Sequence, residues 1–339
     1  MASTGLAVRR IGVLTSGGDA PGMNAAIRAA VRTAQCIGIE CIGIRHGYAG
    51  LIRGDFVPLS EKDVKGLTKM GGTMLYSARS QEFMTDEGRQ RATDTCKYMG
   101  IDGLITIGGD GTFKGALGLA DRGIKVIGIP CTIDNDIGCS SYTIGFDTAC
   151  NTAIEAVDRL SDTMQSHERC SVVEVMGHRT GYLALNVGIA TGATIVLIPE
   201  IKYDFERDVV SRIRTARLAG RTHFMVIVAE GMDPVHVVAE NIQNATGVDT
   251  RVTALGHVQR GGPPLMRDRV TATSMGYTAV MLLARGQGGR IVAMDGDKVI
   301  DIDIHEALAM TKDFDHELYK MFTTLTFLDS KEADIGEPE

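Results

Sequence analysis

Several features are missing from this 339-residue sequence, and each absence excludes a class of protein. Tryptophan is absent, and aromatic residues make up only 5% of the chain. No apolar run approaches the roughly 18 residues that a membrane-spanning helix needs. The first ten residues lack the apolar segment of a secretory signal peptide. We therefore expect no membrane partner, no secretion, and a cytoplasmic location.

Basic clusters, paired cysteines and repeats are missing as well. The chain has 35 Lys and Arg against 42 Asp and Glu, for a formal net charge of −7, and no basic block. A nucleic-acid partner is therefore not expected. The seven cysteines are an odd number without a Cys-x-x-Cys pair, which indicates reduced thiols in a cytosolic protein. No internal repeat, heptad array or low-complexity tract is present.

Glycine, in contrast, is abundant, with 41 residues, and it follows short apolar runs. Gly103–Ile107 is such a run, predicted as a buried parallel strand, and the glycine-rich segment 108–112 comes directly after it. Lys114–Arg122 is predicted as a helix. A second buried strand, Lys125–Pro130, leads into Cys131–Asp136. Together these elements predict a βαβ unit with a polar motif after each strand.

The two motifs are expected to meet at one edge of a sheet. A right-handed crossover ends both strands at the same edge, so Asp110 and Asp134 should face one crevice. Backbone N–H groups of a glycine-rich loop can hold phosphate oxygens, and an Asp among them is a suitable ligand for Mg²⁺. A second Asp can act as general base on an attacking hydroxyl, with Thr132 hydrogen-bonding the acceptor or the transferred group. The pair of motifs therefore predicts phosphoryl transfer.

Alternating strands and helices along the chain predict an α/β fold with mostly parallel sheets. Further strands are predicted at 10–14, 39–44, 170–175, 193–198, 223–229, 252–255 and 291–294. Further helices are predicted up to Cys36 and at 89–98, 148–164, 206–218, 269–285 and 305–310, with Thr148 as an N-cap and Tyr48 in a loop. We expect a domain boundary near 140–145, more than one crossing, and a frayed acidic tail.

Other polar residues stand where such a sheet forms sites. Residues 15–24 are a second glycine-rich turn, but they lack the GxGxxG spacing of dinucleotide-binding oxidoreductases. Glu230 follows an apolar strand directly, and His257 and Arg260 lie beside glycines, which suits capture of a sugar phosphate. Arg79 lies in the polar loop 71–80 and can reach a phosphate. Arg28 and Arg32 share a helix face, which is either solvated or an anion contact.

Taken together, these residues resemble the bacterial-type ATP-dependent 6-phosphofructokinases over about residues 9–310. The likeness is carried by the segments 11–28, 108–111, 132–136, 171–177 and 255–262. It implies two Rossmann-like three-layer αβα domains. Residues 1–145 with 259–310 would bind ATP, and residues 146–258 with 311–339 would bind fructose 6-phosphate.

The resemblance also implies roles for individual residues. ATP would be held by Gly18, Arg79, Ser80, Gly109, Asp110, Gly111 and Thr112, with Asp110 binding Mg²⁺. Asp134 would accept the proton of the sugar's 1-hydroxyl, with Thr132, Asp136 and His178 beside the transferred group. Fructose 6-phosphate would contact Thr132, Ile133, Asp134, Arg169, Met176, Gly177, His178, Glu230, Arg251, His257, Val258, Gln259 and Arg260. Arg169 and Arg251 would come from a neighbouring subunit, which implies a homotetramer with shared substrate sites.

Two positions distinguish the phosphoryl donors in this family. The residue before Thr132 is usually Gly in ATP-dependent members and Lys in pyrophosphate-dependent ones, whereas here it is Cys131. The residue after the metal-binding Asp is Gly111, as in ATP-dependent members, and an Asp there would crowd and repel the ATP phosphates. The sequence therefore favours ATP. A pyrophosphate-dependent or mixed-donor enzyme and a kinase for a related sugar phosphate, such as sedoheptulose 7-phosphate, remain alternatives.

The chain departs from the family pattern at two further places. The family usually has Arg two residues after Met176, but here that residue is His178 and Arg179 follows, so either Arg179 turns inward or the contact weakens. Arg28, Arg32 and Arg221 match basic effector positions, but Glu61, Ser161 and Thr194 stand where Arg, Arg and Glu are common. Activation by ADP is therefore not expected. A non-catalytic nucleotide-sensing subunit is disfavoured because both acidic motif residues are present.

Overall fold

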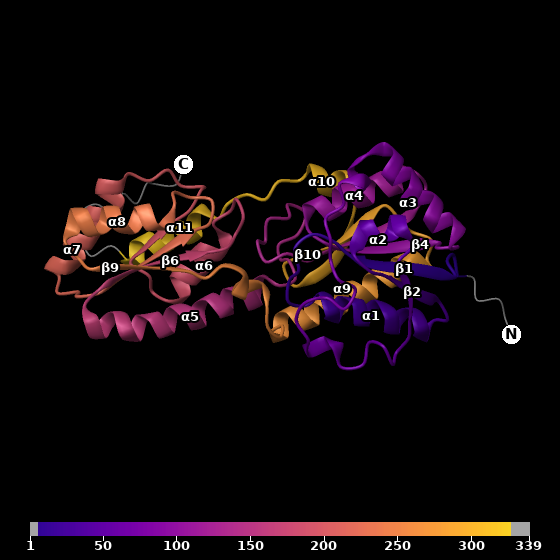
Figure 1. Ribbon diagram of the computed structural model, residues 1–339, viewed down its shortest axis with the longest axis horizontal. Coiled ribbons are helices and arrows are strands. Elements are labelled where there is room, and N and C mark those ends of the chain that lie inside the picture. Colours follow the sequence, from indigo (N-terminus) through magenta and orange to yellow (C-terminus); the bar gives the residue numbers. More distant parts are fainter. Residues whose placement is uncertain (1–5, 327–339) are drawn as a thin grey trace. The chain divides into compact units, whose positions relative to one another are not determined.

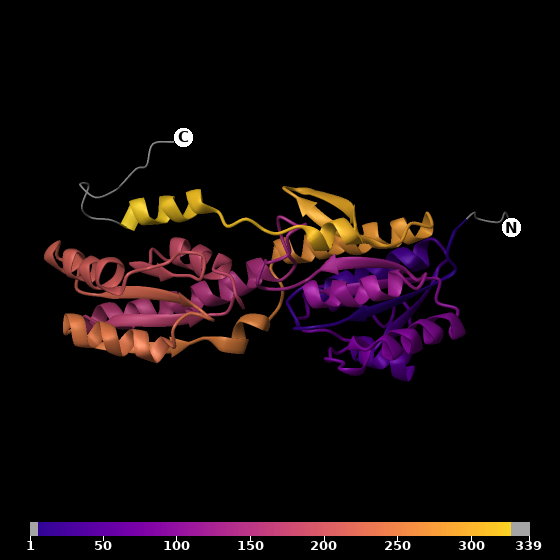
Figure 2. The same cartoon turned by 90° about the horizontal axis from the view of Figure 1, so that it is seen from above.

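The computed structural model describes residues 6–326, which form two α/β units (Figures 1 and 2). The first unit comprises the chain up to Thr148 together with Arg260–Lys312. The second comprises Ala149–Gln259 together with the segment from Asp313. The sequence predicted that the chain passes between the units after residues 145, 258 and 310. The acidic tail that was expected to fray lies outside the described residues.

The first unit is built on a seven-stranded sheet with the order β11-β10-β5-β4-β1-β2-β3. Its five central strands run parallel, and the two edge strands, β11 and β3, are antiparallel to their neighbours. The strands are β1 (Arg10–Thr15), β2 (Glu40–Ile44), β3 (Phe56–Leu59), β4 (Gly103–Gly108), β5 (Lys125–Pro130), β10 (Arg290–Asp295) and β11 (Lys298–Asp303).

Helices cover both faces of this sheet, as Figure 1 shows. One layer consists of α1 (Met23–Cys36) and α9 (Met266–Ala284), which pack on each other. The opposite layer contains α2 (Gly47–Arg53), α3 (Asp86–Tyr98), α4 (Asp110–Ala120) and α10 (Ile304–Ala309), whose apolar side chains share one buried cluster. Side chains alternate along a strand, so the buried strands β4 and β5 contribute side chains to the helix layers on both faces of the sheet. Both faces must therefore be apolar, which explains the continuous apolar sequences of these strands.

The second unit has a four-stranded parallel sheet with the order β7-β8-β6-β9. Its strands are β6 (Cys170–Val175), β7 (Ile195–Leu197), β8 (Phe224–Ala229) and β9 (Thr250–Ala254), and its helices are α5 (Phe146–His167), α6 (Tyr182–Ala190), α7 (Arg212–Leu218), α8 (Val235–Thr246) and α11 (His316–Thr326). Figure 1 shows α7 and α8 on one side of the sheet and α5 on the other. The cluster under α7 and α8 is aliphatic apart from Phe224 and Cys170.

The predicted α/β class with mostly parallel sheets is confirmed, and three local predictions are wrong. Helix α4 begins at Asp110 rather than Lys114, so the glycine-rich motif itself forms the first helical turn. Tyr48 lies in α2 rather than in a loop, and its buried ring stacks on Phe83 with 4.0 Å between the ring centres. Thr148 lies inside the first turn of α5 and does not cap it. The sequence also missed β3, β11, α2, α6, α8 and α11.

A buried carboxylate fixes the segment that leaves the first unit. Asp268, at the start of α9, is fully buried and accepts hydrogen bonds from the hydroxyl of Tyr142 at 2.5 Å and from the N–H of Gly145 at 2.6 Å. It also accepts from the N–H of Thr148 at 3.0 Å and from its hydroxyl at 2.5 Å. Desolvation raises the pKa of this carboxyl, and the four donors oppose the shift. Thr148 is therefore an anchor rather than a cap.

Candidate functional site

The glycine-rich turn after β4 is packed so tightly that only glycine fits at one of its positions. A Cβ atom added to Gly108 would collide with the carbonyl oxygen of Ser16 and with the hydroxyl of Thr112. These two groups are hydrogen-bonded to each other, Oγ1 of Thr112 donating to the Ser16 oxygen at 2.9 Å. The turn after β1 is thereby joined to the turn after β4. Ser77 extends this contact by donating to the carbonyl of Gly17 at 2.5 Å.

The first turn of α4 presents backbone rather than side chains. Gly109 occupies the N-cap position and has no side chain with which to cap the first N–H groups of the helix. A Cβ atom on Gly111 would meet nothing within 4 Å, and one on Gly109 would meet only Thr132, at 3.8 Å. A helix N-terminus with open space over its glycines is suited to binding an anion such as phosphate.

Asp110 is the carboxylate in this turn, and half of its side chain is exposed. Its Oδ2 lies 2.5 Å from the ammonium of Lys114, one helical turn further on. Within residues 6–326, no three His, Cys, Asp or Glu side chains gather as a ready metal site. One accessible carboxylate nevertheless fits Mg²⁺, because this ion usually keeps several waters and takes its other ligands from substrate phosphates.

The segment after β5 lies beside the glycine-rich turn. Strands β4 and β5 pair in parallel with Gly108 opposite Pro130, and the N–H of Cys131 donates to the Gly108 oxygen at 3.0 Å. Within this segment, the Thr132 hydroxyl donates to Oδ2 of Asp134 at 3.2 Å. The fold thus places the two acidic motifs on neighbouring loops at one sheet edge.

Cys131, where the sequence departs from the family pattern, has its side chain inside the protein. Its exposed fraction is 0%. Burial raises the pKa of the thiol well above its ordinary value, and the negative charges of Asp268 and Asp19 add to the shift. The side chain is therefore a neutral thiol without access to a ligand in the loop, and it supplies no cation.

Four more candidate residues of the first unit have definite surroundings. The guanidinium of Arg260 packs over the backbone of Gly18, since a Cβ atom there would lie 2.9 Å from Nη1. Arg79 is exposed on its loop, whereas the neighbouring Ser80 hydroxyl accepts a hydrogen bond from the N–H of Phe83 at 3.2 Å. A cation therefore stands directly beside the first glycine-rich turn.

In the second unit, three strand ends build one loop cluster. The N–H of His178, in the loop after β6, donates to Oε1 of Glu230 after β8, at 2.7 Å. The N–H of Met176 donates to Oε1 of the buried Gln259 after β9, at 3.3 Å. Gly177 has φ 149° and His178 has φ 57°, so the loop bends sharply between these two supports.

The side chains at this carboxyl edge differ in exposure. His178, Arg179, His257 and Val258 are exposed, whereas Met176 is buried. His257 and Val258 lie on the 3₁₀ turn Gly256–Arg260. Ile133, a candidate on the first unit, is buried, so its side chain is a packing residue and only its backbone can meet a ligand.

Arg169 and Arg251 lie at the opposite edge of the second sheet. Arg169 precedes β6, and Arg251 pairs with Ser171 near the start of that strand. The carboxylate of Asp249 binds both arginine side chains. It accepts a hydrogen bond from Nε of Arg169 at 2.6 Å and forms an ion pair with Nη1 of Arg251 at 2.8 Å. The length of β6 separates these arginines from Met176 by about 20 Å. Within one chain, a hexose phosphate cannot contact both edges.

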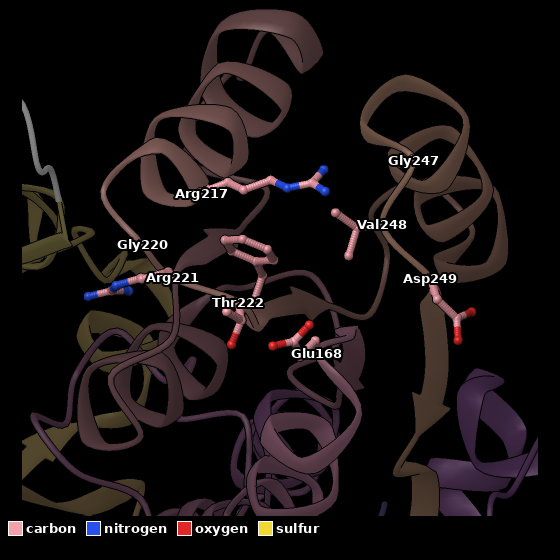
Figure 3. Close-up of a pocket in the computed structure, with 9 residues that line it drawn as sticks. Glu168, Arg217, Gly220, Arg221, Thr222, Gly247, Val248 and Asp249 are labelled. Carbon is pink, nitrogen blue, oxygen red and sulfur yellow. The ribbon is translucent and has the colours of Figure 1, made fainter.

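A cavity of about 240 Å³ opens at the amino edge of the same sheet (Figure 3). Figure 3 shows the Arg217 side chain reaching across it toward Val248, whereas the Arg221 guanidinium points away. Thr194, an expected effector position, is buried and its hydroxyl accepts from the N–H of Met225 at 3.2 Å. Arg221 is thus the expected effector residue at this cavity.

The other expected effector residues lie on the first unit. Arg28 is partly buried on α1. Arg32, one turn later, forms an ion pair with Glu61, the residue that stands where the family commonly has Arg. The reversed charge therefore pairs with a cation that would otherwise face an anionic ligand.

Sequence reasoning missed residues whose partners are distant in the chain. Asp249 holds the candidate residues Arg169 and Arg251, Asp268 holds the segment that leads into α5, and Lys312 donates to the loop that carries Asp134. Asp249 stands two residues before Arg251, and this spacing was a visible signal for the first of these. No local sequence pattern predicted the roles of Asp268 and Lys312, because their contacts join residues more than a hundred positions apart.

The comparisons with known proteins agree with one another. The family model described as "Phosphofructokinase" matches residues 10–283. A curated relative, the ATP-dependent 6-phosphofructokinase of Clostridium tetani, is 47% identical over 320 residues, covering 94% of this chain and 100% of its own length. The protein of the same name from Brevibacillus brevis is 48% identical over 319 residues, with the same coverage.

A solved structure has the same fold. The phosphofructokinase from Saccharomyces cerevisiae superimposes with a TM-score of 0.87 and 33% identity, over 93% of this chain and 50% of the yeast chain.

The packing of the glycines predicts a contrast in stability. Gly108→Ala should lower the free energy of unfolding by about 2 kcal/mol, because the new methyl group meets two polar atoms that are bonded to each other. Gly111→Ala, in the same turn, should leave it unchanged or raise it by up to about 1 kcal/mol, because its methyl group enters open space within a helix. Urea unfolding followed by circular dichroism measures both, and equal midpoints would contradict the packing described.

Proposed function

Because the chain belongs to the phosphofructokinase family, we propose that it transfers the γ-phosphoryl group of MgATP to the 1-hydroxyl of fructose 6-phosphate. The products are fructose 1,6-bisphosphate and ADP. The observation that carries the proposal is the contact between the two acidic loops at the ends of β4 and β5. The identity of 47% over the whole length of a curated ATP-dependent relative supports it.

The first unit is proposed to hold the nucleotide. The N–H groups of Gly109 and Gly111 at the start of α4 would bind phosphate oxygens, with Thr112 holding the turn, and Gly18, Arg79 and Ser80 would complete the site. Asp110 would hold Mg²⁺, which neutralises charge on the phosphates while they react. The open space over Gly111 supports this assignment, because phosphate oxygens can approach its backbone without meeting a side chain.

The loop after β5 is proposed to carry the acceptor chemistry. Asp134 would take the proton of the sugar's 1-hydroxyl as that oxygen attacks phosphorus. The Thr132 hydroxyl, which donates to Oδ2 of this carboxylate, fixes its orientation. Asp136 lies on the same loop, beside the transferred group.

The second unit is proposed to bind the sugar phosphate. Its carboxyl edge would supply Met176, Gly177, His178, Glu230, His257, Val258 and Gln259. Arg260, Thr132 and the backbone of Ile133 are the first unit's own candidate contacts to the acceptor. Arg169 and Arg251 belong to the other edge, too far away for the same ligand. We therefore propose that they serve the 6-phosphate bound to a neighbouring subunit of a homotetramer.

ATP is proposed as the donor for two structural reasons. Gly111 leaves room for a triphosphate, and Cys131 contributes no positive charge, because its thiol is buried and neutral. The glycolytic reaction favours a cytoplasmic location, and so do cysteines that form no disulfide bond within residues 6–326. The ion pair between Arg32 and Glu61 argues against activation by ADP.

The first test is an assay of the wild-type protein. We expect turnover with MgATP and fructose 6-phosphate, at least about tenfold faster than with pyrophosphate or with sedoheptulose 7-phosphate, since a missing favourable contact of about 1.4 kcal/mol already gives that factor. Detecting ADP and fructose 1,6-bisphosphate separately measures it. Faster turnover with pyrophosphate would replace the proposed donor, and faster turnover with the seven-carbon sugar would replace the acceptor.

The role of Asp134 makes a second prediction. Asp134→Asn should lower kcat by about 10³-fold with little change in KM for either substrate, because a general base acts only in the transition state. Glu206→Gln, which neutralises an exposed carboxylate on the second unit, is the matched control and should behave as wild type. An undiminished kcat in Asp134→Asn would exclude this role.

The unusual His178 gives a third prediction. The His178 side chain is exposed, and its backbone N–H donates to Glu230. A longer side chain at this position can therefore be accommodated without changing the loop conformation. His178→Arg should therefore preserve or raise kcat, because a guanidinium carries a permanent positive charge that can contact the transferred phosphoryl group. A large fall in kcat would show instead that the imidazole itself is used.

A further inference from the structure

The segment that carries Asp134 has little regular structure of its own. Residues 131–145 connect β5 to α5 without a helix or a strand, apart from one bridge between Cys131 and Ile144. The Thr143 hydroxyl closes the loop by donating to the carbonyl of Thr132 at 2.7 Å. Asn135, at the turn, has φ 52°, a conformation that a non-glycine residue keeps only when its surroundings hold it.

Lys312, the last residue of the first unit, donates to three atoms of this segment. Its ammonium lies 2.9 Å from Oδ1 of Asn135, 3.0 Å from the carbonyl of Ser140 and 3.3 Å from the carbonyl of Ser141. Oδ1 of Asn135 also accepts from the N–H of Thr143 at 3.1 Å. One ammonium thus joins the turn between the two acidic residues to the returning half of the loop.

The backbone before Lys312 is packed against the same segment. A Cβ atom on Gly138 would collide with the carbonyl of Met310, so the chain at 310–311 lies flat on the loop at a residue without a side chain. Because the backbone lies so close to the loop, the side chain of Lys312 reaches the three oxygen atoms to which it donates. Lys312 lies beyond residues 10–283, which the family model matches, and beyond the stretch on which the sequence resemblance rests.

We propose that Lys312 is a positioning residue for phosphoryl transfer, whose ammonium fixes the turn between Asp134 and Asp136 so that both carboxylates keep their orientation. The inference rests on the proposed function of this loop. Lys312 itself touches neither substrate nor metal, and it acts through Asn135 and the two serine carbonyls.

The charge of this ammonium depends on pH in an accessible range. Burial lowers the pKa of Lys312 from 10.5 to about 8, an effect that the negative charge of Asp136 and the neighbouring Cys139 oppose. Burial raises the pKa of the Cys139 thiol, so it stays neutral in this range. Below pH 8 the group is an ammonium with three N–H bonds for three acceptors. Above pH 8 the neutral amine of Lys312 has only two N–H bonds, so the loop loses one hydrogen bond and the positive charge.

The test combines Lys312→Met, Lys312→Arg and Lys298→Met, the last removing an exposed lysine of β11 as a matched control. For Lys312→Met we expect kcat about 10-fold to 100-fold lower, KM for MgATP within about threefold of wild type, and a thermal unfolding midpoint that excludes global unfolding at the assay temperature. Lys298→Met should match wild type in all three measurements.

The pH profile of kcat separates positioning from bulk stability. Wild type should lose activity as pH rises through about 8, and Lys312→Arg, which keeps its charge, should retain activity and move this fall to higher pH. A fall at the same pH in Lys312→Arg, or a kcat of Lys312→Met equal to that of Lys298→Met, would overturn the inference while leaving the proposed function intact. Absence of wild-type turnover with any donor would overturn both.

Discussion

The parallel pairing of β4 with β5 is the constraint on which the candidate site depends. The register places Gly108 opposite Pro130, so both strands end together and their loops emerge side by side. A shift of one residue would turn each buried side chain to the other face of the sheet and would separate the loops. Because both strands are apolar on both faces and covered by helices, this register is strongly specified.

Single polar side chains hold several segments of the candidate site that have no regular structure. Asp268 holds the start of α5, Lys312 holds the turn at Asn135, and Glu230 and Gln259 hold the loop after β6. Each is a charged or amide group that bonds backbone N–H or carbonyl groups, and Asp268 and Lys312 bond side chains as well. Such segments cannot satisfy their own polar groups, so side chains from elsewhere in the chain supply the missing partners.

The two edges of the second sheet explain a feature of the site that a single chain leaves incomplete. Met176 and Glu230 follow their strands, whereas Arg169 and Arg251 stand at strand starts, and the strand length separates the two groups. Asp249 keeps the two arginines together, so the amino edge carries a paired guanidinium group of its own. Under the proposed function, self-association would let both edges serve one sugar phosphate.

The sequence by itself determined the buried parallel strands and the residues at their ends, but not the edge strands β3 and β11. Short apolar runs that lead into a glycine-containing or polar motif indicate a buried strand and a turn locally. For this reason the strands β4, β5 and β6, and the positions of Asp110 and Asp134 after two of them, could be predicted. Only the tertiary structure decided that Asp110 starts α4, that Tyr48 is buried, and which residues hold Asn135 and Thr148. Those features depend on contacts between positions far apart in the chain, and sequence patterns report only neighbours within a few residues.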